Sequence, residues 1–225
     1  MGGSLGHLIR AIVFDFDGLI LDTETPEYQA WQRVYREHGA ELPMALWVRC
    51  IGTDRSAFDP LEYLESLVGA SSDRAGLLAR RRAIHDEALA RSSALPGVEQ
   101  YLRSALARGL RRGVASSSSR RWVTGHLSNL GLADYFNTVV CRDDVERVKP
   151  DPALYRLATE RLGVDPDEAL ALEDSPNGIA AAKAAGLRCV AVPNPMTRAL
   201  PLDQADLVVT SLAEVGLDLL LERLE

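Results

Sequence analysis

The chain has 225 residues, of which 47% are hydrophobic and 25% charged, a composition typical of a globular protein with one large domain or two small ones. Its net charge of −7 argues against nucleic acid or an anionic membrane as the main partner, and no apolar run approaches the roughly 18 residues of a membrane-spanning helix. The three cysteines form no C-x-x-C pair, so we expect no zinc or disulfide framework and a cytoplasmic protein with reduced thiols.

The first predicted strand lies at residues 9–16, an apolar run that ends in acidic residues and a glycine. Thr25 and Pro26 then predict the start of a helix, with Thr25 as its N-cap and Pro26 at its first position. From there to residue 92 the apolar residues recur at helical spacing, and the last helix of this stretch is expected at residues 73–92. We therefore expect residues 25–92 to form a helical domain without strands.

After residue 92, short apolar strands alternate with helices. The strands are expected at residues 110–115, 138–141, 169–172, 189–192 and 207–209. Strands separated by single helices form βαβ units, which assemble into a parallel sheet covered by helices on both faces. The sequence thus predicts an α/β protein with a doubly wound, Rossmann-like core formed by residues 1–24 and 93–225, interrupted by the helical domain at 25–92.

Acidic residues lie at the carboxyl ends of two of the predicted strands. Asp15 and Asp17 lie at the end of the first strand, and Glu173 and Asp174 at the end of the fourth. Because ligands bind beyond the carboxyl ends of strands in open parallel sheets, we expect up to four carboxylates in one crevice. Such crowding is costly unless a cation lies between the acids, and Mg²⁺ prefers oxygen ligands of this kind. Turn formation and helix capping are the alternative explanations for each pair.

Two other strand ends carry groups that suit an anion. Ser116 and Ser117 offer hydroxyl and N–H groups at a strand-to-helix turn, although helix capping alone would also explain a serine there. Lys149 follows the third strand and is one of only two lysines, because the chain otherwise uses arginine for its cations. This bias indicates a site that requires a compact ammonium rather than an ordinary surface lysine. Together with the acids, these groups suit phosphoryl transfer to an aspartate.

Four motifs, taken in this order, resemble those of haloacid dehalogenase (HAD) superfamily hydrolases of the subclass I type, which carry a helical cap. They are FDFDGLILDTE at 14–24, VASSSS at 114–119, KPDPALY at 149–155 and LEDSPNG at 172–178. The resemblance covers nearly the whole chain and implies that residues 25–92 are the cap. It implies that Asp15 is the nucleophile that becomes phosphorylated, and that Asp17 is the general acid and then the general base.

The resemblance also implies how the phosphoryl group and the metal are held. Ser116 and the N–H of Ser117 would hold the phosphoryl group, and Lys149 would neutralise its charge. The cofactor would be Mg²⁺, with a ligand set drawn from the first and fourth motifs: Asp15, Asp17 through its main-chain carbonyl, Asp174, and Glu173 directly or through water.

Within the superfamily, the chain is similar to the group that contains sugar-phosphate phosphatases, phosphoglycolate phosphatase and β-phosphoglucomutase. The similarity to the mutase extends to residues 52–55 in the cap and to residues 118–120. However, the mutase carries a histidine in the first cap helix where this chain has Glu27, and this difference favours a phosphatase. The expected substrate contacts are Arg55, Glu24 and Ser118.

We therefore expect a Mg²⁺-dependent phosphatase that hydrolyses a small phosphorylated metabolite, such as a sugar phosphate or a phosphoglycolate-like compound, as a monomer or homodimer. No nucleic acid or membrane partner is expected. A β-phosphoglucomutase-like mutase is the first alternative. A non-catalytic phosphoacceptor or binding protein is an alternative of another class, which the acid at position 17 and the inserted cap disfavour. A glycosidase would also use paired carboxylates, but Ser116 and Lys149 suit an anion instead.

Overall fold

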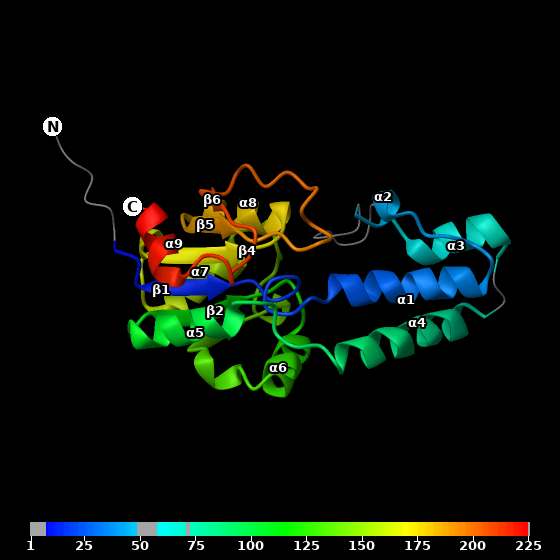
Figure 1. Cartoon of the computed structure of the whole chain (residues 1–225), viewed down its shortest axis with the longest axis horizontal. Coiled ribbons are helices and arrows are strands. Elements are labelled where there is room, and N and C mark those ends of the chain that lie inside the picture. The colour runs from blue at the N-terminus through cyan, green and yellow to red at the C-terminus, as the bar shows by residue number, and fades with distance from the viewer. Residues whose placement is uncertain (1–7, 49–57, 71–72, 225) are drawn as a thin grey trace.

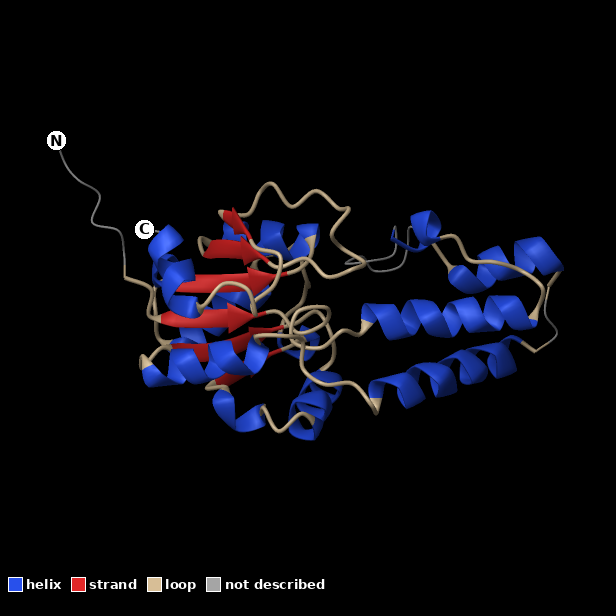
Figure 2. Cartoon of the chain, viewed as in Figure 1, coloured by secondary structure: helices blue, strands red, loops and turns tan. Residues whose placement is uncertain are grey.

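The computed structural model describes residues 8–48, 58–70 and 73–224 of the chain. One sheet of six parallel strands forms its centre, in the order β3-β2-β1-β4-β5-β6 (Figures 1 and 2). The strands are β1 (Ala11–Phe14), β2 (Arg111–Ala115), β3 (Thr138–Val140), β4 (Ala169–Glu173), β5 (Arg188–Ala191) and β6 (Leu207–Val208). The predicted doubly wound α/β fold is confirmed, and each predicted strand is found within two residues of its expected ends.

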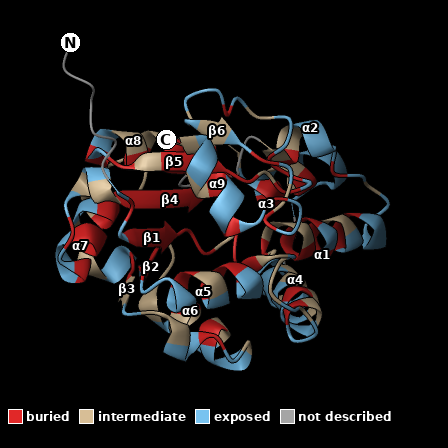
Figure 3. Ribbon diagram, turned by 60° about the vertical axis from the view of Figure 1, so that its left-hand side comes forward, coloured by how far each residue is buried: buried red, intermediate tan, exposed pale blue. Residues whose placement is uncertain are grey.

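The central strands are buried on both faces, which explains why they read as continuous apolar runs (Figure 3). Alternate side chains of β1 serve two separate cores. Ile12 and Phe14 pack in the core beneath α5 (Val98–Ala107), α6 (Arg120–Asn129) and α9 (Leu217–Leu224), whereas Ala11 and Val13 pack beneath α7 (Ala153–Leu162) and α8 (Pro176–Ala185). The connections of the sheet, in the described part of the chain, include the short 3₁₀ helices Ala133–Tyr135, Arg142–Asp144 and Pro166–Glu168.

The strand register brings the ends of β1, β2 and β4 to one level. Phe14 of β1 pairs with Val114 of β2 and with Leu172 of β4. The residues that follow these three positions therefore leave the sheet side by side, at its carboxyl edge. This register is what places the polar groups of distant motifs next to one another.

Between β1 and α5, the described residues form four α-helices: α1 (Glu24–Glu37), α2 (Met44–Trp47), α3 (Pro60–Val68) and α4 (Arg74–Leu89). We call them the inserted helices. They extend beyond the carboxyl edge of the sheet, with α1 and α4 side by side (Figure 1), and they bury a core of their own that includes Tyr28, Trp31 and Tyr35. The described residues of this segment contain no strand.

The start of α1 differs from the prediction. The helix begins at Glu24, preceded by Thr23 rather than by Thr25 as N-cap. The side chain of Asp22 accepts the N–H of Thr25 at 2.9 Å, so a carboxylate upstream satisfies the first turn. Pro26 then occupies the third position of the helix, where its missing N–H leaves no helix bond unmade.

Among the described residues, no helix combines the length and apolar character needed to cross a membrane. Two of the three cysteines, Cys141 and Cys189, fall in the described part of the chain and are buried free thiols.

Candidate active site

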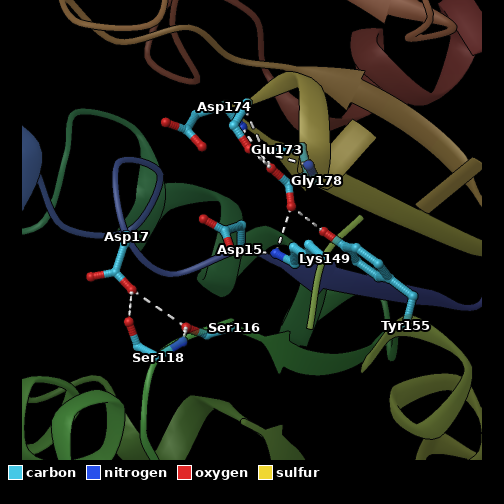
Figure 4. Close-up of polar contacts among 10 residues, drawn as sticks. Asp15, Asp17, Ser116, Ser118, Lys149, Tyr155, Glu173, Asp174 and Gly178 are labelled. Atoms are coloured by element: carbon cyan, nitrogen blue, oxygen red, sulfur yellow. Dashed lines mark hydrogen bonds and ion pairs between the residues drawn. The ribbon is translucent and has the colours of Figure 1, made fainter. Parts of the chain in front are cut away.

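Three carboxylates meet where β1 and β4 end. Asp15 leaves β1 with its main-chain N–H bonded to the Leu172 carbonyl at 2.9 Å, Glu173 is the last residue of β4, and Asp174 follows it. Their side-chain oxygens include a set that lies within 4.8 Å of one another. All three residues are buried, with Asp15 7% exposed and Glu173 fully enclosed. Figure 4 shows this cluster together with the basic and hydroxyl groups around it.

Lys149 lies against two of these acids. Its ammonium donates to an oxygen of Asp15 and to Oε1 of Glu173, the latter at 2.6 Å (Figure 4). The ring of Tyr155, on the first turn of α7, has its centroid 5.0 Å from the same nitrogen. Although burial lowers the pKa of Lys149, the charges of Asp15 and Glu173 raise it above its ordinary value, so the side chain is an ammonium.

Glu173 holds the surrounding groups in place. Its Oε1 accepts the Tyr155 hydroxyl at 2.6 Å as well as the lysine, and its Oε2 accepts the N–H of Asp174 at 3.1 Å. The N–H and hydroxyl of Ser175 lie 3.4 Å from Oε2. A Cβ on Gly178, in the first turn of α8, would meet the Glu173 carboxylate at 2.0 Å, so only glycine allows this approach. Five protein donors thus occupy a carboxylate that offers about four lone-pair positions.

One ammonium cannot neutralise three buried carboxylates. Burial raises the pKa of Asp15 to about 8 despite the lowering effect of Lys149, and Glu173 adds to the rise. Burial, followed by the charges of Asp15 and Glu173, raises the pKa of Asp174 well above its ordinary value. Carboxylates in this state are stabilised by a hard dication, which takes oxygen ligands. The donor set therefore fits a divalent metal ion, with Asp15 and Asp174 the acids that have capacity left to bind it.

The fifth strand also contributes to this edge. Asn194 follows β5, and its amide nitrogen donates to Oδ2 of Asp174 at 2.7 Å and to the Gly18 carbonyl at 3.1 Å. Gly18 has a φ of +84°, and a Cβ there would meet Oδ2 of Asp174 at 2.4 Å. The turn after β1 thus requires glycine both for its backbone conformation and for the close approach of the acid.

Asp17 lies on the β2 side of the site and faces the serines that follow that strand (Figure 4). Its Oδ2 accepts the Ser118 hydroxyl at 2.7 Å and lies 3.4 Å from the Ser116 hydroxyl, and its Oδ1 accepts the indole N–H of Trp122 at 2.9 Å. Ser116 is fully buried and its oxygen accepts the N–H of Ser118 at 3.0 Å. The Ser116–Ser118 turn therefore presents hydroxyl groups directly beside Asp17.

The remaining predicted residues divide into three cases. Ser117 lies in the turn between Ser116 and Ser118 and is partly buried. Glu24 is the first residue of α1, and its charge is one of those that raise the pKa of Asp174, so it lies within electrostatic reach of the acids. Arg55 and the rest of residues 52–55 lie outside the described residues.

Three residues of the site were missed from the sequence: Tyr155, Trp122 and Asn194. Tyr155 is part of the third motif, but its bond to Glu173 depends on how α7 packs. Asn194 carries the same signal as the four predicted strand ends, a polar residue just after a strand, and extending that rule to the fifth strand would have found it. Trp122 lies on a helix, where no spacing rule points to Asp17.

The chain is similar to proteins whose names include phosphatases and β-phosphoglucomutases. The family model for haloacid dehalogenase-like hydrolases matches residues 12–192. "Putative phosphatase YhcW" of Bacillus subtilis is 48% identical over 96% of this chain and 98% of its own length. "Phosphorylated carbohydrates phosphatase" of Thermotoga maritima is 32% identical over 80% and 82% of the two chains. A crystal structure described as "putative beta-phosphoglucomutase from Thermotoga maritima" superimposes with a TM-score of 0.78 at 29% identity, covering 95% of this chain and 99% of its own.

Proposed function

The chain belongs to the haloacid dehalogenase-like hydrolase family and is a phosphatase, and from this premise we propose that it hydrolyses a small phosphomonoester in two steps through a phosphorylated Asp15. The observation that carries the proposal is the contact of the Lys149 ammonium with Asp15, inside a cluster whose acid oxygens lie within 4.8 Å. A carboxylate held this way is placed as a nucleophile beside groups that attract an anion.

In the first step, a carboxylate oxygen of Asp15 forms a bond to phosphorus while the bond from phosphorus to the ester oxygen breaks. Asp17 gives its proton to the departing alkoxide, which leaves as an alcohol. In the second step, the Asp17 carboxylate takes a proton from a water molecule, whose oxygen bonds to phosphorus. The bond between phosphorus and Asp15 breaks, which returns the free carboxylate and releases phosphate.

The phosphoryl group would lie between the β2 and β3 connections. The hydroxyl of Ser116 and the N–H of Ser117 would donate to its oxygens, and Lys149 would neutralise part of its charge. This arrangement is supported by the burial of Ser116 next to Asp17 and by the bonds of Lys149 to Asp15 and Glu173.

Mg²⁺ is the proposed cofactor. Its ligands would be Asp15, Asp174 and the main-chain carbonyl of Asp17. Glu173 would bind directly or through water, as far as its five protein donors leave it free to do so. When bound, the dication would neutralise the charge on the transferring phosphoryl group and on the crowded acids.

A phosphorylated sugar or a phosphoglycolate-like compound is the proposed substrate class. The names of the relatives support it, because one of them acts on phosphorylated carbohydrates. Glu27, at the position where the mutase would carry a histidine, has its side chain 6% exposed and accepts a bond from Arg81 at 2.6 Å. A carboxylate tied in this way is a poor proton carrier, which favours hydrolysis over the mutase reaction.

The test is a phosphate-release screen with Mg²⁺ over hexose phosphates, phosphoglycolate and nucleoside monophosphates. The wild type is compared with Asp15→Asn and with the matched control Asp134→Asn. Asp134 is an exposed residue that is not part of the candidate site. We expect the wild type and Asp134→Asn to release phosphate, and Asp15→Asn to be inactive. Equal activity in all three proteins would refute the role of Asp15. Interconversion of hexose 1- and 6-phosphates without phosphate release would establish the mutase alternative.

A further inference from the structure

Trp122 connects Asp17 to the inserted helices. The residue lies in the first turn of α6, and its indole N–H donates to Oδ1 of Asp17 at 2.9 Å. Trp122 is partly buried, and it packs against the hydrophobic core that contains Ile12 and Phe14. An indole nitrogen can only donate, and a bond to a carboxylate is of the stronger, charge-assisted kind.

Two histidines fix the plane of the indole ring. His85 of α4 stacks on it, with ring centroids 5.9 Å apart and an interplanar angle of 7°. His126, one turn further along α6, meets it edge to face, with centroids 4.3 Å apart and an angle of 70°. Aromatic pairs prefer these offset-stacked and edge-to-face arrangements. The indole ring that donates to Asp17 is therefore held by His126 of α6 on one side and by His85 of the inserted helices on the other.

His85 is in turn fixed within the inserted helices. Its side chain is 9% exposed, and its Nε2 lies 3.7 Å from the carboxylate of Glu27 on α1. Arg81, one turn before His85 on α4, donates to the same carboxylate at 2.6 Å. A chain of contacts thus runs from α1 and α4 through His85 and Trp122 to the carboxylate of Asp17.

We propose that Trp122 is a positioning residue for Asp17, and that its stacking on His85 makes the orientation of the Asp17 carboxylate depend on the position of the inserted helices. The inference rests on the proposed function, in which Asp17 protonates the leaving group. The Trp122 bond fixes Oδ1 and the serine bonds fix Oδ2, so the carboxylate has one orientation when α4 is in contact with α6. Without the indole N–H, Oδ1 has no fixed direction and the proton is misplaced.

The effect of losing such a positioning residue depends on the leaving group of the substrate. Benzyl phosphate releases an alkoxide that needs a proton, whereas 4-nitrophenyl phosphate releases a stabilised phenolate that leaves without one. Both probes have a similar size and one aromatic ring. A defect in the placement of Asp17 therefore lowers kcat/KM for the first probe and spares the second, whereas a general structural defect lowers both.

The first experiment measures both probes with Mg²⁺ on the wild type, Trp122→Phe, His85→Leu and Trp47→Phe. Trp122→Phe keeps a ring between the histidines and removes the N–H. We expect its kcat/KM for benzyl phosphate to fall about 10- to 100-fold, the worth of a hydrogen bond to a charged group. The value for 4-nitrophenyl phosphate should stay near that of the wild type. His85→Leu should give the same pattern with a smaller loss, and Trp47→Phe, the control in the inserted helices, should leave the ratio of the two values unchanged.

The outcomes separate this inference from the proposed function. If the wild type is active and Trp122→Phe lowers kcat/KM equally for both probes, or for neither, the positioning role is refuted and the phosphatase proposal stands. A wild type that hydrolyses neither probe nor any substrate of the screen contradicts both. In an Asp17→Asn background, Trp122→Phe should cause no further loss on benzyl phosphate, because the two residues act through one carboxylate; additive losses would overturn the inference.

A second experiment needs neither activity nor a change at Trp122. The chain has three tryptophans, and the indole N–H groups of Trp31 and Trp47 have no acceptor in the described part of the structure. In ¹⁵N-labelled protein we expect one indole resonance to be shifted downfield by the carboxylate and to move upfield in Asp17→Ala. Three indole resonances that are unaffected by Asp17→Ala would refute the bond on which the inference depends.

Discussion

Raising the pH of the metal-free protein should destabilise it, because its buried acids keep their protons only in the folded state. Burial raises the pKa of Asp15 to about 8 and that of Asp174 well above its ordinary value. In the unfolded chain both ionise near pH 4. Between about pH 5 and 7 the folded protein therefore binds more protons than the unfolded chain, so the free energy of unfolding falls as the pH rises.

The size of the effect follows from the number of protons. Each carboxyl that is protonated only in the folded state lowers the free energy of unfolding by about 1.4 kcal/mol per pH unit. Asp15 alone gives a loss of roughly 3 kcal/mol from pH 5 to 7, and Asp174 adds to it; this is a large share of the roughly 5–15 kcal/mol of a typical domain. Burial lowers the pKa of His126, so below about pH 7 the unfolded chain binds more protons at this residue than the folded protein does, which opposes the effect of the acids. The slope is therefore best measured above about pH 7.

Urea unfolding at several pH values, in EDTA and again with Mg²⁺, measures this slope. We expect a clear fall with pH in EDTA, a weaker fall in Asp174→Asn, and little or none with saturating Mg²⁺, because the cation replaces the protons. The interpretation of the acids as a metal site would be refuted by a free energy of unfolding that does not depend on pH in EDTA, or by the same slope with and without Mg²⁺.

Three substitutions test other contacts of the site. Gly18→Ala and its control Gly39→Ala each place a Cβ at positive φ, with a strain of about 1–2 kcal/mol. Only the Cβ at position 18 meets Asp174, so kcat/KM should fall about 100-fold in Gly18→Ala alone. Equal losses of kcat/KM in the two variants would contradict this. Tyr155→Phe should lower the free energy of unfolding in urea by about 1.5–3 kcal/mol, because buried Glu173 loses a donor. Lys149→Met should lower it by about 3–5 kcal/mol and abolish phosphate release; a stable, active variant would exclude the proposed role of the ammonium.

The fold and most of the site follow from rules that act along the chain. Apolar runs such as residues 11–14 and 169–172 predict buried strands, and the parallel arrangement brings Asp15, Ser116 and Glu173 to one edge because the register aligns Phe14 with Val114 and Leu172. No spacing rule was needed to bring these motifs together. The position of a polar residue just after a strand was sufficient.

What could not be predicted depends on side-chain packing between elements. The predicted start of α1 was wrong by two residues, both at the N-cap and at the first helical position, because Asp22, rather than Thr25, satisfies its first turn. The contacts of Trp122 with Asp17 and His85 join three segments, and their meeting depends on how α4 packs against α6. Neither composition nor periodicity carries information about such a contact.

Chemical trapping of the intermediate tests the central proposal most directly. The protein is mixed with a phosphomonoester that it hydrolyses, quenched during turnover, and treated with borohydride, which reduces an aspartyl phosphate to homoserine. Peptide mass mapping then locates the change. The proposal predicts reduction at Asp15 and at no other aspartate, dependent on substrate. Phosphate release with an unmodified Asp15, or with the modification at Asp17 or Asp174, would contradict it.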